Sequence, residues 1–228
     1  MATRMVVPVV AMFLGFSACT KAKDDMPVVV AQPLPVSRLD ARSAGEAPER
    51  SIQFRDAIGW HVLALSKSKV HKPFDEFQDE DVIRLSATLY RRDPDNGRLG
   101  KVWEIRDSVS CVGLDIAADF FHQATSVTDL DGNGRVEVTV AYRMFCGGGV
   151  DPKEVKVIMR EGGRKYALRG ESRIEVKGQA PYGGQREKSR LPSSTPKVFV
   201  DHLEKTWRAV YIERPLTRWD GCFPGWDA

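Results

Sequence analysis

The stretch Ile83-Arg84-Leu85-Ser86-Ala87-Thr88-Leu89 alternates apolar with polar side chains. Side chains two residues apart lie on the same face of a β-strand, so this alternation predicts a strand with one buried face. The stretch Val136-Glu137-Val138-Thr139-Val140-Ala141-Tyr142-Arg143 repeats the pattern and predicts a second half-buried strand. Further strands are expected at 60–65, 101–106, 155–159, 165–168 and 173–176.

Short turns with glycine or proline separate these predicted strands. Examples are Asp93-Pro94-Asp95-Asn96-Gly97 and Glu161-Gly162-Gly163. Long helical crossovers, which parallel strands require, do not alternate with the strands. We therefore expect a mainly β domain over residues 51–178, built as an antiparallel sheet or a small sandwich.

The C-terminal part of the sequence predicts one helix that packs on the sheet. Residues 179–194 are rich in Gly, Pro, Ser, Lys and Arg and are expected to form a solvated connection. In the region 195–228, Thr195 can cap a helix with Pro196 at its first position, and Pro215 can end it. An aromatic tail follows, with Trp219, Phe223 and Trp226. The apolar face of the helix would consist of Phe199, Leu203, Trp207 and Val210 or Tyr211.

The N-terminus indicates export. Arg4 precedes an apolar run, Val6–Phe16, that is too short to span a bilayer. Bulky Phe16 disfavours ordinary signal peptidase cleavage after Ala18, because that enzyme prefers a small residue there. Residues 1–18 are thus interpreted as a signal peptide that precedes a lipidated cysteine; the alternatives to a lipoprotein are a buried helix start or a plain secreted protein.

The segment Leu14-Gly15-Phe16-Ser17-Ala18-Cys19 resembles the lipobox of bacterial lipoproteins, with Phe16 where that family prefers Leu. The resemblance implies that Cys19 carries a lipid. It also implies membrane anchoring in the cell envelope, at the outer membrane facing the periplasm or the surface. Residues 19–50 contain four prolines and no sustained periodicity, which is typical of a flexible tether.

Composition and charge favour a single folded core and argue against nucleic acid as a partner. Of all residues, 42% are hydrophobic and 29% are charged, which suits one ordinary core. The net charge is +3, and loss of Arg4 with the signal peptide leaves +2. So small an excess does not predict nucleic-acid binding.

Three cysteines remain if Cys19 is lipidated: Cys111, Cys146 and Cys222. Cys111 and Cys146 each lie at the edge of a predicted strand, so we expect a disulfide between them in an oxidising compartment. Cys222 would then be unpaired. The alternative is three free, buried thiols.

Oxygen-bearing side chains recur at regular spacing in the run Asp129-Leu130-Asp131-Gly132-Asn133-Gly134-Arg135-Val136-Glu137. Alternate side chains can supply oxygen ligands to a hard cation, Gly134 permits a sharp turn, and the Arg135 carbonyl can add a neutral oxygen. We predict a structural calcium site of weak affinity. The alternative is a plain hairpin turn, because Asp-Gly and Asn-Gly both favour hairpins. The predicted ligands are Asp129, Asp131, Asn133, Arg135 and Glu137.

This run resembles the calcium loops of integrin-like propellers, although one copy without repeats does not indicate a propeller. More broadly, residues 80–176 resemble a little-characterised family of bacterial envelope proteins, some of which are labelled surface polysaccharide biosynthesis proteins. The features that carry this resemblance are Cys111 to Asp115, Val127 to Val138, Cys146, and the segments 156–159 and 165–170.

Catalytic motifs are missing from the sequence. His61, His71, His122 and His202 are widely separated, and the acidic run 75–81 is typical of a solvated edge. We therefore expect a lipid-anchored protein that binds or scaffolds an envelope protein or polysaccharide. The alternative is an enzyme or accessory factor in surface polysaccharide biosynthesis.

Overall fold

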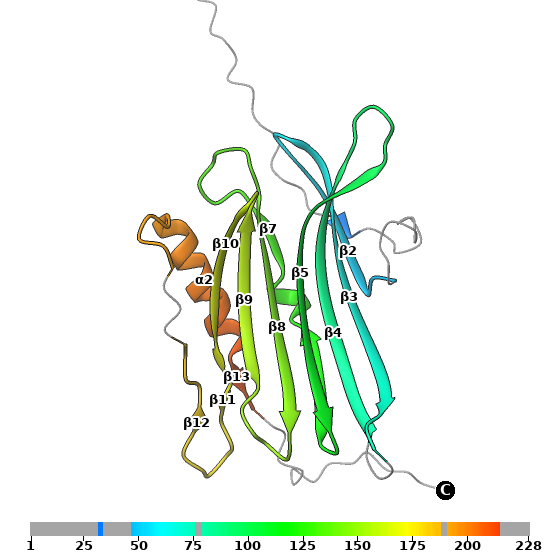
Figure 1. Ribbon diagram of the computed structural model, residues 1–228. Helices are drawn as coiled ribbons and strands as arrows, with labels where there is room; N and C mark the ends of the chain where they lie inside the picture. Colours follow the sequence, from blue (N-terminus) through cyan, green and yellow to red (C-terminus); the bar gives the residue numbers. More distant parts are fainter. Residues whose placement is uncertain (1–31, 34–46, 76–78, 188–190, 215–228) are drawn as a thin grey trace, which may run out of the picture.

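The computed structural model describes residues 32–33, 47–75, 79–187 and 191–214, and shows two antiparallel sheets flanked by one α-helix (Figure 1). The prediction of a mainly β fold with a helix near the C-terminus is confirmed. Two sheets share one core, which corresponds to the sandwich alternative.

The first sheet has the order β1-β2-β3-β4-β5, and β3, β4 and β5 are its long strands, of 14 or 15 residues each. All neighbouring strands in it are antiparallel, and the β4–β5 ladder contains a bulge between Leu89 and Tyr90. Its strands are β1 (Gln32–Pro33), β2 (Arg50–Asp56), β3 (Gly59–Pro73), β4 (Asp79–Arg92) and β5 (Leu99–Val112).

The second sheet has the order β10-β9-β8-β6, and β7 pairs with β8 beside β6. A small third sheet, β12-β11-β13, adjoins the helix region and contains one parallel pair, β11 with β13. The strands are β6 (Asp115–Phe120), β7 (Ser126–Thr128), β8 (Glu137–Gly147), β9 (Glu154–Glu161), β10 (Arg164–Glu171), β11 (Arg173–Ile174), β12 (Tyr182–Gly183) and β13 (Ile212–Glu213). A short 3-10 helix, η2 (His122–Ala124), joins β6 to β7.

The main core lies between the two sheets. Every second residue of the first quoted stretch, from Ile83 to Leu89, points into it, as the alternation predicts. From the second sheet, Val138, Val140 and Tyr142 of β8 meet these side chains. Burial of this shared apolar surface is the main force that joins the sheets.

Strand β8 differs from the expectation of a half-buried strand, because it is buried on both faces. Glu137, Thr139 and Ala141, on the face away from the main core, all have 0% exposure. The reason is a second apolar cluster in which the helix α2 (Lys197–Val210) covers this side of the sheet. Alternation along β8 thus separates two buried environments instead of core from solvent.

Helix α2 buries the face predicted for it: Phe199, Leu203, Trp207 and Val210. Its start was predicted wrongly. Pro196 is the N-cap residue, not the first helical residue, and the Thr195 hydroxyl does not cap the helix but donates to the Pro192 carbonyl. The helix ends at Val210, before β13, and Pro215 lies outside the described residues.

The segment 179–187, expected as a solvated connection, is tied to the second sheet. Arg186 bridges Gly170 of β10, and its guanidinium pairs with Glu204 and lies 5.7 Å from the Trp207 ring centroid. A side chain at Gly170 would place a Cβ atom 2.4 Å from the Gln185 carbonyl oxygen, so the close approach requires glycine.

Within the expected tether, Gln32–Pro33 pairs with β2. The signal peptide and Cys19 lie outside the described residues, as do Cys222 and the aromatic tail. No helix in the described ranges is long and apolar enough to cross a membrane.

Candidate metal centre

The oxygen-rich run forms the connection between β7 and β8. Pairing of Thr128 with Glu137 closes this connection, so its two ends lie side by side. Gly132 and Gly134 have φ angles of 69° and 78°, values that L side chains rarely adopt. The prediction of a sharp turn at Gly134 is confirmed.

Three of the predicted ligands converge. One carboxylate oxygen from each of Asp129, Asp131 and Glu137 lies within 4.8 Å of the others. Glu137 comes from the first residue of β8, while the two aspartates come from the turn. Three carboxylates at this separation repel one another unless a cation or a proton compensates the charge.

Two oxygens of this triad are buried without a hydrogen-bond partner in the described part of the chain: Asp129 Oδ1 and Glu137 Oε1. The other oxygen of each group is engaged. Asp129 Oδ2 accepts from the Gly134 amide at 2.9 Å, and Glu137 Oε2 accepts from the Leu130 amide at 2.8 Å. The carboxylates of Asp129 and Glu137 are therefore each oriented by a backbone amide through one oxygen, and the other oxygen is open to a ligand. Asp131 differs, because both of its oxygens accept from Asn133.

Burial affects the charge of Glu137. Desolvation is the main cause that raises its pKa to about 7, and the nearby Asp131 and Asp129 carboxylates raise it further. The Leu130 amide acts in the opposite direction, because it stabilises the ionised form. Near neutral pH the triad thus carries a carboxyl group that is easily protonated when no cation is bound.

Asn133 forms hydrogen bonds through both ends of its side-chain amide. Its amide oxygen accepts from the Arg135 backbone at 2.7 Å, and its Nδ2 donates to Asp131 and to Glu161 Oε1, the latter at 2.8 Å. These hydrogen bonds hold the loop in place, and a ligand role for the Asn133 oxygen stays a prediction. A ligand role for the Arg135 carbonyl stays a prediction.

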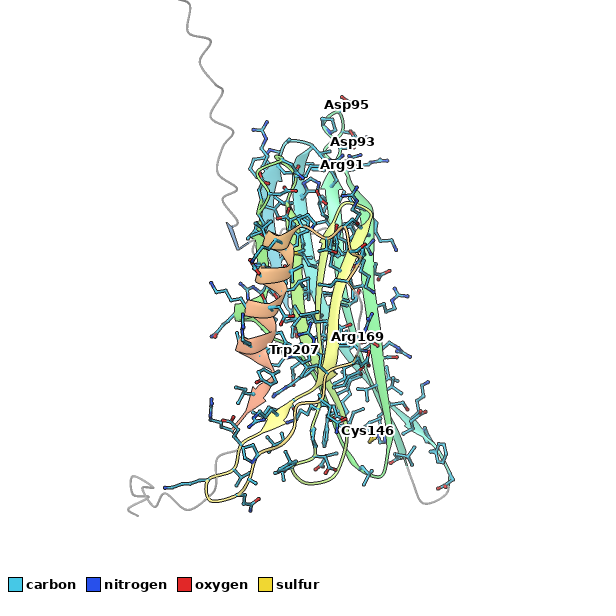
Figure 2. The ribbon with its side chains drawn as sticks, turned by 90° about the vertical axis from the view of Figure 1, so that its left-hand side faces the viewer. Arg91, Asp93, Asp95, Cys146, Arg169 and Trp207 are labelled. Carbon is cyan, nitrogen blue, oxygen red and sulfur yellow. A yellow bond between two sulfur atoms is a disulfide. The ribbon has the colours of Figure 1, made fainter. Side chains whose placement is uncertain are left out.

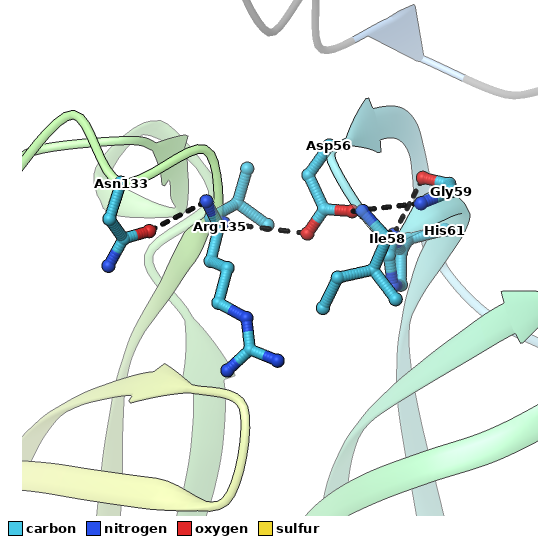
Figure 3. A network of polar contacts seen from close by, with 7 residues as sticks. Asp56, Ile58, Gly59, His61, Asn133 and Arg135 are labelled. Atoms are coloured by element: carbon cyan, nitrogen blue, oxygen red, sulfur yellow. Dashed lines mark hydrogen bonds and ion pairs between the residues drawn. The ribbon is translucent and has the colours of Figure 1, made fainter.

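Two acidic residues that hold the loop were not predicted. Glu161, at the end of β9, anchors Asn133, and Asp56 reaches the loop from the β2–β3 turn (Figure 3). Only the pairing of β8 with β9, which places Glu137 opposite Glu161, brings the first of these close. No local signal in the sequence indicates either contact.

Asp56 joins the oxygen-rich loop of residues 129–137, called the metal loop for its candidate ligands, to the β2–β3 turn. Its Oδ1 accepts from the Ile58 and Gly59 amides at 2.8 and 3.1 Å, and its Oδ2 accepts from the Val136 amide at 3.5 Å. The Ala57 amide also donates to the Gly134 carbonyl at 2.8 Å. The two connections therefore form one hydrogen-bonded unit (Figure 3).

The predicted disulfide between Cys111 and Cys146 is confirmed, with Cα atoms 5.4 Å apart. It joins β5 of the first sheet to β8 of the second.

The four histidines have separate sets of partners and do not form one site. His61 contacts Asp56, His71 contacts Asp79 and Asp81, and His122 contacts Glu49. His202 Nε2 lies 3.2 Å from Ser126 Oγ and 3.1 Å from Thr139 Oγ1, and so links α2 to the second sheet.

Comparisons with known proteins found no similarity: no family model matches the chain, and no curated protein or solved structure matches it.

Proposed function

We propose that this chain is a lipid-anchored cell-envelope protein of the binding or scaffolding type, whose β domain contains a structural calcium loop. The observation that supports the loop is the convergence of Asp129, Asp131 and Glu137 with two buried oxygens left unpaired in the described structure. The lipobox-like segment that ends at Cys19 supports the anchor.

Calcium fits the donor set. It is a hard cation that prefers carboxylate and carbonyl oxygens, and the triad offers carboxylates only. Bound calcium would supply the positive charge that the three carboxylates lack. Asp129, Asp131 and Glu137 would hold it, and Gly134, Leu130 and Asn133 would keep those side chains and the turn in place through the hydrogen bonds described above.

The role is structural because the loop links elements rather than lining a reaction centre. Its hydrogen bonds reach β9 through Glu161 and the β2–β3 turn through Asp56. A cation in the triad would therefore hold the end of β8 and the two neighbouring connections in one arrangement.

Calcium titration of the mature protein tests the loop. We expect millimolar calcium to raise the melting temperature by mass action, whereas the double variant Asp129→Asn/Asp131→Asn should show no rise. Asp95→Asn is the matched control, since it removes a carboxylate from another glycine-containing turn. A wild-type melting curve that calcium does not move would refute the site.

The anchor is tested separately. Cys19→Ser should abolish incorporation of labelled fatty acid and release the protein from the membrane fraction. A variant that stays with the membrane, together with an unmodified wild-type N-terminus, would contradict the lipoprotein assignment.

A further inference from the structure

A groove of about 1050 Å³ lies at one end of the first sheet, between the β2–β3 turn and the β4–β5 hairpin. Figure 2 shows Arg91, Asp93 and Asp95 grouped at this end, while Cys146 lies toward the opposite end. The metal loop adjoins it, because Asp56 and Ala57 bind the loop directly before the groove residues Ile58 and Trp60.

Apolar side chains line this groove without being covered. Ile58 and Trp60 are each 43% exposed, and Val102 is 46% exposed. The Arg55 guanidinium lies over the Trp60 ring, 5.9 Å from its centroid, because the two residues are direct cross-strand partners in β2 and β3. This contact orients the indole and leaves part of its surface open to a ligand.

The groove is also strongly cationic for a chain with so small a net charge. Its lining contains five cations and two carboxylates, Asp93 and Asp95, so the local balance is +3. Asp93 is engaged within its turn, where Oδ1 accepts from the Asp95 amide at 2.8 Å. Across the described ranges, none of the four arginines forms an ion pair, and Lys101 pairs with Glu104. The cations are Arg55, Arg91, Arg92, Arg98 and Lys101.

Guanidiniums that form no ion pair in the described structure, beside a half-exposed indole, suit a ligand that offers both anionic groups and an apolar face; of these arginines, Arg92 also donates to the Gly97 carbonyl at 3.4 Å. We propose that this groove binds a chain of acidic sugars. The C–H face of a sugar ring can stack on Trp60, and its carboxylate or sulfate groups can accept paired hydrogen bonds from Arg91, Arg92 or Arg98. Binding to a bilayer requires apolar side chains that protrude from the protein surface. These side chains instead line a concave groove, which suits an extended chain better than a flat bilayer.

This assignment rests on the proposed envelope function, since it names the class of ligand that the binding protein would take. The metal loop holds one wall of the groove through Asp56, so calcium would order the wall without contacting the ligand.

Binding of defined oligosaccharides to the mature protein tests the groove. The probes are hyaluronan, alginate and heparin oligosaccharides, with maltooctaose and chitohexaose as neutral counterparts, measured by calorimetry at constant calcium. We expect at least one acidic probe to bind and the neutral probes not to bind. Affinity should fall steeply as salt is added, because the arginines are solvent-accessible. Trp60→Ala, and separately Arg91→Gln/Arg98→Gln, should weaken binding at least about tenfold.

Two control variants separate the groove from general effects. Trp60→Phe keeps an aromatic face and should retain most of the affinity. Lys197→Gln/Arg208→Gln removes two cations from α2 and should leave affinity unchanged. All variants should melt cooperatively near the wild-type temperature, which shows that they are folded whether or not calcium shifts the curve.

Three results would overturn the groove assignment. These are no binding of any acidic probe, equal binding of neutral probes, or binding only to vesicles that contain phosphatidylglycerol, which would indicate a membrane-docking surface. The calcium and lipid-labelling experiments are independent of this assay. They would still support the proposed function if the groove failed, and the groove could bind sugar if they failed.

Discussion

Glu137 is the residue at which strand formation, burial and charge conflict. Its position at the start of β8 places a carboxyl group at 0% exposure beside two aspartates. Burial without a compensating positive charge destabilises the ionised form of a carboxyl group, and this raises the pKa of Glu137. Residues that carry such a cost in a native structure are candidates for ligand binding.

The calcium-free domain should therefore lose stability as the pH rises. Because the folded pKa of Glu137 is raised from 4.5 to about 7, its contribution is fully present below pH 4.5 and is lost as the pH rises through 7. With calcium removed by chelator, Glu137→Gln should unfold at higher urea concentration than wild type at pH 8. The gain should be at most about 3 kcal/mol, and little difference should remain at pH 4.5. A variant less stable than wild type at pH 8 would contradict this account. The same variant should not respond to calcium.

At the scale of secondary-structure elements, the described connections are held by side chains that reach across the sequence. Asp56, which is 80 residues from Val136, links the β2–β3 turn to the metal loop. His202 links α2 to β7 and β8 through two hydroxyl groups. Apolar packing brings these elements together but is not directional, so the hydrogen bonds fix their relative positions.

Replacement of Asp56 should loosen both connections at once. Asp56→Ala would leave the Ile58 and Gly59 amides without their acceptor, at a cost of about 1–3 kcal/mol. Asp56→Asn keeps one acceptor oxygen and should cost less. Urea unfolding gives the stability, and amide hydrogen exchange at Ile58, Gly59 and Val136 locates the effect. Unchanged exchange at Val136 in Asp56→Ala would show that the turn and the loop are independent.

The docking of α2 should depend on pH with the opposite sign to Glu137. Burial is the main cause that lowers the pKa of His202 below 6.5, with a further contribution from Lys205. Protonation is thus disfavoured in the folded state, and this contribution to stability is lost as the pH falls below 6.5. His202→Gln keeps a hydrogen-bonding group for Ser126 and Thr139 and should reduce the loss of stability between pH 7 and pH 5. His61, whose pKa burial also lowers, accounts for part of the remaining loss. A pH slope identical to wild type would exclude His202 as a contributor.

At the scale of the whole molecule, apolar burial joins three layers of the described structure, and a disulfide links two of them. The first sheet, the second sheet and α2 enclose two separate apolar clusters. The Cys111–Cys146 disulfide crosses the first interface, between the two sheets, at a sequence separation of 35.

Loss of this disulfide should destabilise the fold without changing it. Cys111→Ser/Cys146→Ser should lower the free energy of unfolding by about 2–4 kcal/mol, because the unfolded chain gains freedom. Reduction of the wild type should give a similar loss, and reduction of the double variant should give none. Non-reducing peptide mapping supplies the control, since a bond from Cys222 to Cys111 or Cys146 would contradict the pairing.

The sequence alone predicted most of the longer strands, several of the turns, the disulfide and the buried face of the helix, but it did not predict β2, β6 or β7. Apart from the disulfide, each of these predictions depends on neighbours within a few residues: alternation along 83–89, glycine in the turns, and a repeat of three to four residues from Phe199 to Val210. It also located the acidic triad of the candidate metal site, because Asp129, Asp131 and Glu137 lie in one short run.

The tertiary arrangement decided what surrounds these elements. Burial of β8 on both faces required α2 to pack on the second sheet, so the alternation could not distinguish helix contact from solvent. The register of β8 against β9 brings Glu161 within hydrogen-bond distance of Asn133. The contacts of Asp56 and the groove around Trp60 depend on turns that strand pairing brings together. Contacts of this kind are set by how sheets twist and pack over long sequence separations, and no local pattern of residues encodes that geometry.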